Sequence, residues 1–234
     1  MSTASRRAAV LVAGGTGALG AAVLAELLDS GYPVTATWVV EKERERVEHD
    51  FAGRDGLTLR QADLMDERAV EDVVAQVDRL GAVVNLVGGF AAPGKVHESS
   101  VEDFESMLRL NLRPTFLLAR AAIPRLAADG GGAFVAVSAR PALRPFPGAA
   151  GYITAKAGVL ALIQALDAEY RGDGVRCNAI LPSVIDTPAN RASQPNADHS
   201  KWVPPQQIAK VVRFLVSDDS TPTSGAGIPV YGRA

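Results

Sequence analysis

Short apolar runs alternate with longer amphipathic stretches along almost the whole chain. Continuous runs of Val, Leu and Ala are typical of strands that are buried on both faces, as in parallel sheets covered by helices. Right-handed crossovers then give a doubly wound, mostly parallel, seven-stranded α/β sheet with its ligand crevice at the carboxyl ends of the strands. The predicted strands are 8–13, 34–40, 57–62, 82–87, 133–138, 175–181 and 227–230. The predicted helices are 18–29, 41–50, 67–80, 101–128 with an interruption near Pro114, 149–170 and 206–215.

The domain organisation follows from length and rhythm. With 234 residues and 47% hydrophobic residues, the chain suits one α/β domain spanning 1–234, and no linker or repeat marks a boundary. The segment 186–205 interrupts the rhythm with four prolines and no clear period. Long irregular segments in compact domains are usually functional, so we expect a substrate lid at 186–205, with a variable surface loop as the alternative.

Composition excludes several classes of protein. A net charge of −2 gives no electrostatic reason to bind nucleic acid or an acidic membrane. The single Cys177 lies in an apolar run, where we expect a small buried hydrophobe, and the three scattered histidines have no metal-ligand spacing, so no metal is expected. Met1 to Arg7 is short and polar, and the apolar run after it is too short for a signal sequence or a membrane span. These features predict a soluble cytoplasmic protein.

A glycine-rich turn follows the first predicted strand and opens the first predicted helix. Its pattern, Gly15-x-Gly17-x-x-Gly20, is the fingerprint of dinucleotide binding in a Rossmann fold when it occurs in this context. The glycines allow a tight turn, and the helix N-terminus faces the pyrophosphate. The alternative is a glycine-rich turn without a ligand. The predicted cofactor-binding residues of the turn are Gly14, Gly15, Thr16, Gly17, Ala18, Leu19 and Gly20.

Two further strand ends carry polar residues on the crevice side. Asp63, followed by Leu64, ends the third predicted strand, where its carboxylate is placed to accept from the adenine amino group. A helix N-cap is the alternative role for Asp63. Asn85, followed shortly by Gly88, ends the fourth predicted strand. We therefore expect all four residues to contribute to the cofactor site.

The end of the second predicted strand bears on the choice of cofactor. Dinucleotide-binding folds usually place an acidic residue there, on the ribose 2′-hydroxyl. In this chain the position is Trp38, so no carboxylate repels a 2′-phosphate. Lys42 or Arg44 is near enough in sequence to reach a phosphate, although both also suit a solvated helix face among glutamates. The sequence predicts a slight preference for NADP over NAD.

Tyr152 and Lys156 lie four residues apart on a predicted helix and therefore share a face. A tyrosine titrates near pH ~10 in water, and an adjacent ammonium is expected to lower that pKa toward neutrality. Ser138 lies fourteen residues before Tyr152. Its hydroxyl is suited to hold a substrate oxygen while Tyr152 supplies or removes the proton.

With these residues in this order, the chain resembles the short-chain dehydrogenase/reductase family over nearly its whole length. The resemblance implies an NAD(P)-dependent oxidoreductase that moves hydride between nicotinamide and a carbonyl or alcohol carbon. It implies a catalytic tetrad of Asn111, Ser138, Tyr152 and Lys156, in which Asn111 holds a water and Lys156 also binds the nicotinamide ribose. Further cofactor contacts implied by the resemblance are Pro182, Ile185 and Thr187.

Within that family the motifs are most similar to those of dihydropteridine reductases. The similarity is carried by residues 14–20, 88–90, 186–191 and 195–202. Those reductases carry an aspartate at the position of Trp38 and lack the serine, so Ser138 favours a substrate whose carbonyl oxygen must be held. Reduction of a quinonoid pterin is the alternative activity. A sensor that binds dinucleotide without catalysis is a second alternative, although it would not need the serine, tyrosine and lysine.

The crevice-side loops contain rings and cations near Ser138. Phe90, Phe146 and Trp202 are predicted to form an apolar pocket above the nicotinamide, with ordinary packing as the alternative. Arg140 and Arg144 are either substrate contacts or solvated loop residues.

The predicted helix 149–170 carries apolar residues on several faces, more than one sheet face requires, which suggests a partner surface. The family resemblance also implies a homodimer or homotetramer built on this helix. Its apolar residues are Ile153, Val159, Leu160, Leu162, Ile163 and Leu166.

Overall fold

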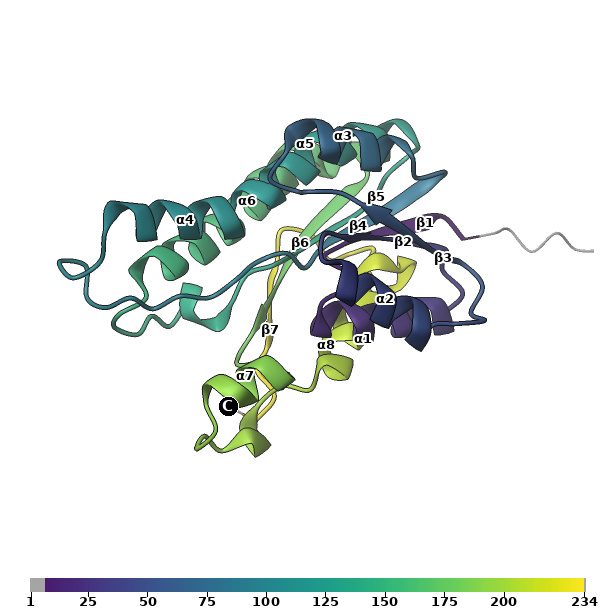
Figure 1. Ribbon diagram of the computed structural model, residues 1–234. Helices are drawn as coiled ribbons and strands as arrows, with labels where there is room; N and C mark the ends of the chain where they lie inside the picture. Colours follow the sequence, from purple (N-terminus) through teal and green to yellow (C-terminus); the bar gives the residue numbers. More distant parts are fainter. Residues whose placement is uncertain (1–6, 234) are drawn as a thin grey trace, which may run out of the picture.

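The computed structural model describes residues 7–233, so most of the predicted N-terminal segment Met1 to Arg7 lies outside the described residues. A twisted sheet forms the centre, with helices on both faces (Figure 1). All strand pairs are parallel, in the order β3-β2-β1-β4-β5-β6-β7, which confirms the predicted doubly wound sheet. The strands are β1 Ala9–Ala13, β2 Val34–Trp38, β3 Leu57–Gln61, β4 Leu80–Asn85, β5 Gly132–Val137, β6 Val175–Pro182 and β7 Gly227–Val230.

The strand order reverses at β1, which pairs with β2 on one side and with β4 on the other. In doubly wound sheets, ligands bind at such a reversal, outside the carboxyl ends of the strands. The segments that leave the carboxyl ends of β1, β4, β5 and β6 therefore define where a functional site is to be sought.

Two helical layers cover the sheet (Figure 1). Helices α1, α2 and α8 lie on one face, and α3 to α6 lie on the other, while α7 stands beyond the end of the sheet. Most of these helices match the predicted ranges within one or two residues. The helices are α1 Ala18–Asp29, α2 Glu41–Asp50, α3 Glu67–Ala75, α4 Val101–Asn111, α5 Arg113–Ala128, α6 Ala150–Tyr170, α7 Pro188–Ser193 and α8 Pro205–Val216.

The core explains why the strands are continuously apolar. Leu11 of β1 packs into the cluster under α3, α5 and α6, whereas its neighbours Val10 and Val12 pack into the cluster under α1 and α8. Successive side chains of a strand point to opposite faces, so a sheet covered on both faces needs apolar residues at every position. Cys177 lies in the same core as a buried free thiol, as predicted, and burial raises the pKa of this thiol to about 12.

The predicted boundaries between the helix 67–80 and the strand that follows it were displaced. The predicted helix 67–80 ends at Ala75, and the next strand begins at Leu80 rather than two residues later. Arg79 between them has a left-handed φ of 47°, and a right-handed helix cannot continue through such a residue. Val77 and Leu80 are buried as the core residues of a helix are. The apolar period of the sequence therefore continues beyond Ala75, where α3 ends.

The predicted interruption in the helical stretch 101–128 occurs at Leu112, between α4 and α5. Pro114 lies in the first turn of α5, where the missing N–H of proline costs nothing. The interruption is important for the site because it makes Asn111 the last residue of α4.

The segment 186–205 is more regular than predicted. It contains α7 and a turn of 3-10 helix at His199–Lys201, and Ile185 pairs with Val203 in an isolated parallel bridge. The hydroxyl of Thr187 accepts from the Asn190 N–H at 3.2 Å and caps α7. This side-chain cap allows the short helix α7 to form in a segment whose prolines led us to expect no regular structure.

Candidate active site

The glycine-rich turn, residues 14–20, joins β1 to α1 at the carboxyl end of the sheet. Gly20 is required because a Cβ there would lie 2.3 Å from the carbonyl oxygen of Gly15, so only glycine lets the helix approach the turn this closely. Gly17 is the N-cap of α1 and supplies no side-chain hydrogen bond. The N–H groups of Ala18 and Leu19, in the first helical turn, therefore remain available to an anion such as a pyrophosphate.

Helix α2 reaches this turn with two charged side chains that the sequence did not reveal. The Thr16 hydroxyl donates to the carboxylate of Glu43 at 3.0 Å, and the guanidinium of Arg46 donates to the Thr16 carbonyl oxygen. Thr16 itself is 3% exposed. The three-residue spacing of Glu43 and Arg46 places both on one face of α2, which is the signal that could have identified them.

Lys42 and Arg44 are the two cations that the sequence suggested for binding a 2′-phosphate, and the structure gives them other surroundings. Arg44 forms ion pairs with Glu41 and Glu48, and its guanidinium lies 5.5 Å from the ring centroid of the half-buried Trp38. This arrangement matches the solvated helix face that was the alternative for Arg44. Lys42 is exposed and appears in none of the ion pairs of the described chain.

At the end of β3, the exposed carboxylate of Asp63 accepts from the Met65 N–H at 2.9 Å, while Leu64 is buried. The N-cap of α3 is Asp66, which accepts from the Ala69 N–H at 2.9 Å. The N-cap alternative for Asp63 was therefore wrong, because the helix begins later than that alternative required. One carboxylate oxygen of Asp63 has no hydrogen bond within the described chain.

Asn85 ends β4 and is 1% exposed. Its amide oxygen accepts from the Val87 N–H at 3.0 Å, and its amide nitrogen donates to the Thr115 hydroxyl at 2.9 Å. Asn85 thus fastens the end of β4 to α5 and fixes the course of the chain toward Gly88. Both hydrogen-bonding groups of the Asn85 side chain therefore have partners within the protein.

The structure brings Ser138 and Lys156 together. Ser138 directly follows β5, and Lys156 lies in the second turn of α6. The Ser138 hydroxyl donates to the backbone oxygen of Lys156 at 2.7 Å, and the Lys156 ammonium donates to the backbone oxygen of Val137 at 2.9 Å. Two hydrogen bonds in opposite directions therefore join the end of β5 to α6.

Asn111 reaches the same place from the end of α4. Its amide oxygen accepts from the Gly89 N–H at 3.1 Å, and its amide nitrogen donates to the Met107 backbone oxygen at 3.1 Å. A Cβ on Gly88 would lie 2.6 Å from that amide oxygen and 3.0 Å from the Lys156 ammonium. The backbone at Gly88 therefore lies against both groups, and all four members of the predicted tetrad come from elements that meet at this loop.

The electrostatics of the tyrosine and the lysine differ from the expectation. The Lys156 ammonium lies 5.9 Å from the centroid of the Tyr152 ring. Burial raises the pKa of Tyr152 to about 12 and lowers the pKa of Lys156 to about 8. The predicted lowering of the Tyr152 pKa was wrong because loss of water around the phenol outweighs a charge at this distance.

A cluster of aromatic rings includes Tyr152. The Phe90 ring meets the Tyr152 ring edge-on at 5.0 Å between centroids and lies 6.4 Å from the Phe146 ring. Phe90 and Phe146 are 61% and 41% exposed. Trp202 is buried instead and packs on His199 at 4.3 Å, so the exposed ring cluster consists of Phe90, Phe146 and Tyr152.

The remaining predicted contacts follow β6. Pro182 is its last residue, Ile185 forms the bridge to Val203, and Thr187 opens α7. These three residues lead from the carboxyl end of β6 into the segment 186–205.

Residues 7–233 contain no group of three or more His, Cys, Asp or Glu side chains placed to hold a metal ion. They also contain no helix with the length and apolar character needed to cross a bilayer.

Known proteins are similar to this chain in sequence and in fold. A family model described as enoyl-(acyl carrier protein) reductase matches residues 14–232. The chain is 32% identical over 240 residues to a 2-(R)-hydroxypropyl-CoM dehydrogenase of Xanthobacter autotrophicus, with 95% of this chain and 96% of the relative covered. It is 30% identical over 249 residues to a (3R)-3-hydroxyacyl-CoA dehydrogenase of Mus musculus, with 97% and 96% covered. A solved short-chain type dehydrogenase/reductase from Mycobacterium ulcerans has a TM-score of 0.91 at 24% identity, over 97% of this chain and 90% of that one.

The chain belongs to the short-chain dehydrogenase/reductase family. It is an NAD(P)-dependent oxidoreductase that acts on alcohol or carbonyl groups, with a nucleotide cofactor and a small-molecule substrate as its reaction partners. The predictions of family, fold class and enzyme class are confirmed.

Proposed function

We propose that Ser138, Tyr152 and Lys156 carry the reaction, with Asn111 holding a water of a proton relay beside the lysine. The observation that carries this proposal is the pair of hydrogen bonds, from Ser138 to Lys156 and from Lys156 to Val137, that join the end of β5 to α6 beside the Tyr152 ring. When bound, the nicotinamide ring supplies or accepts the hydride.

In reduction, Tyr152 is the general acid that gives a proton to the carbonyl oxygen. Its pKa of about 12 keeps the phenol protonated at neutral pH, as a general acid requires. Ser138 would orient the same oxygen by turning its one hydroxyl proton from the Lys156 backbone oxygen to the substrate. Lys156 places a positive charge beside the phenol, while its own pKa of about 8 keeps it charged at neutral pH. Because Lys156 is 5% exposed, little water screens that charge.

The cofactor would be held along the carboxyl edge of the sheet. The turn 14–20 offers N–H groups to the pyrophosphate, and Gly88 allows close approach beside Lys156, which would also bind the nicotinamide ribose. We assign the adenosine side to Trp38, Asp63 and Leu64. The remaining contacts in this assignment are Asn85, Tyr152, Pro182, Ile185 and Thr187.

For cofactor choice we propose that both nucleotides are accepted, with a slight lean to NADP(H). No carboxylate follows β2 at Trp38, and Arg46 lies against the glycine-rich turn, where a 2′-phosphate would gain a cation. Glu43 lies against the same threonine and opposes that gain, so the lean stays small.

The decisive experiment combines a substrate screen with one substitution. Oxidation of NADPH and NADH is followed with ketones, aldehydes and quinonoid dihydropterin. Tyr152→Phe should keep cofactor binding, measured as a dissociation constant, and lose hydride transfer to every substrate that the wild type reduces. Tyr170→Phe, at the far end of α6, is the matched control and should keep full turnover. Undiminished turnover by Tyr152→Phe would remove the proposed role.

A quinonoid pterin is the second candidate substrate, because the motifs at 14–20, 88–90, 186–191 and 195–202 resemble those of dihydropteridine reductases. Such a reaction needs no hydroxyl to hold a carbonyl oxygen, so Ser138→Ala separates the two. Loss of turnover in Ser138→Ala favours a carbonyl substrate, and full retention with dihydropterin favours the pterin. A wild type that binds cofactor but reduces nothing in the screen would favour the sensor.

We further propose that the chain is a single domain in which 186–205 closes over the substrate, and that it forms a homodimer or homotetramer. Within α6, Val159, Ile163 and Leu166 are buried inside the subunit, so part of its apolar surface is already covered. Phe104 and Phe116 on the neighbouring helices α4 and α5 are 39% and 51% exposed and extend the surface available to a partner. Light scattering at micromolar concentration tests the assembly, and a monomer would exclude it.

A further inference from the structure

The loop that follows Ser138 carries positive charge only. From residue 138 to residue 148 it carries Arg140 and Arg144 and no acidic residue. Neither arginine has a carboxylate within 4.0 Å in the described chain, whereas Arg171, Arg191 and Arg213 each pair with one. Among residues 7–233, no carboxylate lies within ion-pair distance of the positive charge on this loop.

Arg140 is the better placed of the two arginines. It is half-buried and lies two residues after Ser138, whereas Arg144 is exposed. Its guanidinium lies 5.1 Å from the ring centroid of Tyr231. Tyr231 is fixed in turn, because the Ser183 hydroxyl donates to its backbone oxygen at 2.8 Å just beyond the ends of β6 and β7.

This placement puts Arg140 on the crevice side of the sheet. The chain beyond β7 ends beside α7, past the carboxyl ends of the strands (Figure 1). A guanidinium that has lost part of its water and stacks on an aromatic ring keeps its donors for a planar anion such as a carboxylate. A bound carboxylate would supply the counterion that the loop lacks.

The site also has an apolar surface. The exposed ring of Phe90 lies against the Tyr152 ring, and the exposed Phe146 ring lies 6.4 Å from that of Phe90, so these rings provide a surface for the body of a substrate. The residues around Ser138 thus offer ring faces, a hydroxyl and a half-buried guanidinium.

We propose that the substrate is an oxo acid with an apolar or aromatic body, whose carboxylate is bound by Arg140. This inference rests on the proposed function. In the reduction, hydride moves from the reduced nicotinamide to the carbonyl carbon and Tyr152 gives its proton to the oxygen. The products are the hydroxy acid and the oxidised cofactor, and the carboxylate stays bound to Arg140 without change.

The test compares three aromatic oxo acids with their methyl esters, which remove the charge and keep the carbonyl. The pairs are benzoylformate, benzoylpropionate and para-acetylbenzoate with their esters, all ketones, so that the distance from carbonyl to carboxylate varies. Binding to the protein saturated with NADP+ is measured by calorimetry, because no hydride transfer occurs with that combination. Turnover with NADPH is measured separately.

We expect at least one acid to bind the wild type roughly tenfold to a hundredfold more tightly than its ester. Arg140→Met should abolish that difference, and Arg140→Lys should keep part of it, since it keeps the charge but not the planar fork. Arg144→Met is the matched control on the same loop and should keep the preference. Melting temperature and NADP+ affinity report whether each variant is folded.

Equal binding of every acid and its ester by the wild type would overturn the inference, as would an unchanged preference in Arg140→Met. Loss of the preference in Arg144→Met alone would also overturn it. If acids and esters are reduced equally well, the proposed function stands and the carboxylate site fails. If the acid preference depends on Arg140 and no carbonyl compound is reduced, the carboxylate site stands and the proposed function fails.

Discussion

The hydroxyl of Ser138 donates a hydrogen bond to the backbone oxygen of Lys156 at 2.7 Å. The two residues are eighteen positions apart in sequence and belong to different elements, yet this bond fixes the start of α6 against the end of β5. Because both side chains are buried, little water competes for either partner. The relationship sets the position of the tyrosine on the same helix and is the basis for the predictions that follow.

Gly88→Ala tests the convergence of the loop after β4 with Asn111 and Lys156. The new methyl group would lie 2.6 Å from the Asn111 amide oxygen and 3.0 Å from the Lys156 ammonium, so one of the two groups must move. We expect turnover to fall about a hundredfold, as misplacement of reacting groups by about 1 Å can cause. The control is Gly172→Ala, where a Cβ meets nothing within 4 Å, and it should leave kcat unchanged. Equal effects of both substitutions would contradict the close approach.

The pH dependence of reduction should report Lys156. Its pKa of about 8 means that the ammonium beside Tyr152 is lost as pH rises through that value, whereas Tyr152 keeps its proton to about pH 12. We therefore expect kcat/KM for reduction to fall as pH rises through about 8, with a single titrating group. A profile that stays flat up to pH 10 would show that the lysine remains charged in the working enzyme.

Lys156→Met should stabilise the fold while abolishing activity. Burial lowers the pKa of Lys156 from 10.5 to about 8, which corresponds to about 3 kcal/mol of destabilisation at pH 7. Below about pH 8 the lysine is charged in both states, so the penalty is complete, and it is relieved between pH 8 and 10.5 as only the folded state loses its proton. Allowing about 1 kcal/mol for the lost hydrogen bond to Val137, unfolding free energy should rise by about 2 kcal/mol.

Urea unfolding of Lys156→Met at pH 7 and pH 10 provides the measurement. The gain in stability over the wild type should be larger at pH 7 than at pH 10. Lys210→Met on α8 is the control, and it should change unfolding free energy by less than about 0.5 kcal/mol at either pH because it is an exposed surface residue. A destabilised Lys156→Met would mean that the hydrogen bond outweighs burial.

Glu43 and Arg46 should set cofactor choice from opposite sides of Thr16. Glu43→Gln removes a negative charge next to the glycine-rich turn and should tighten NADPH relative to NADH by about tenfold, or about 1.4 kcal/mol. Arg46→Gln should shift the ratio in the opposite direction. Dissociation constants at low and high salt measure both, and the exposed Glu45→Gln is the matched control on α2. If Glu43→Gln and Glu45→Gln give the same ratio, Glu43 has no specific role.

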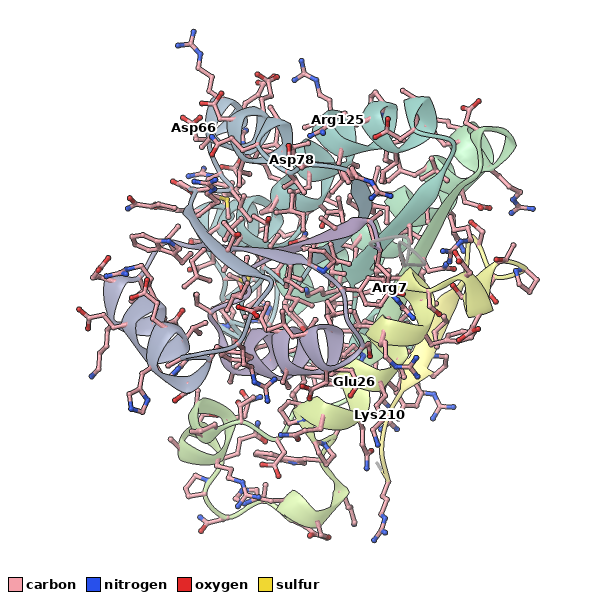
Figure 2. All side chains as sticks on the ribbon, turned by 90° about the vertical axis from the view of Figure 1, so that its right-hand side faces the viewer. Arg7, Glu26, Asp66, Asp78, Arg125 and Lys210 are labelled. Atoms are coloured by element: carbon pink, nitrogen blue, oxygen red, sulfur yellow. The ribbon has the colours of Figure 1, made fainter. Side chains whose placement is uncertain are left out.

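Other arginines lie at the opposite end of the molecule. Figure 2 shows the face turned toward the amino ends of the strands, where Arg7 lies near α8. The guanidinium of Arg7 stacks over the Tyr32 ring at 4.5 Å, as that of Arg140 stacks over the Tyr231 ring, whereas Arg213 pairs with Glu26 at 3.0 Å. Arg140 differs from Arg7 in its place, two residues after Ser138.

The sequence by itself determined the sheet and the spacing of the reacting groups. Buried strands on both faces need continuous apolar residues, so Val10 to Val12 are readable as a strand without any knowledge of what covers them. Tyr152 and Lys156 share a face because four residues make about one helical turn. These properties depend on neighbours along the chain, and local periodicity records them.

Tertiary structure decided what depends on residues distant in sequence. Burial of the phenol raises the pKa of Tyr152, although the adjacent lysine alone predicts the opposite, because desolvation is set by every element packed around the ring. In the same way, only packing brings Arg46 to Thr16 and Tyr231 to Arg140. Contacts between distant segments leave no period in the sequence, so the fold and the chemistry were predictable while the electrostatics and the specificity contacts were not.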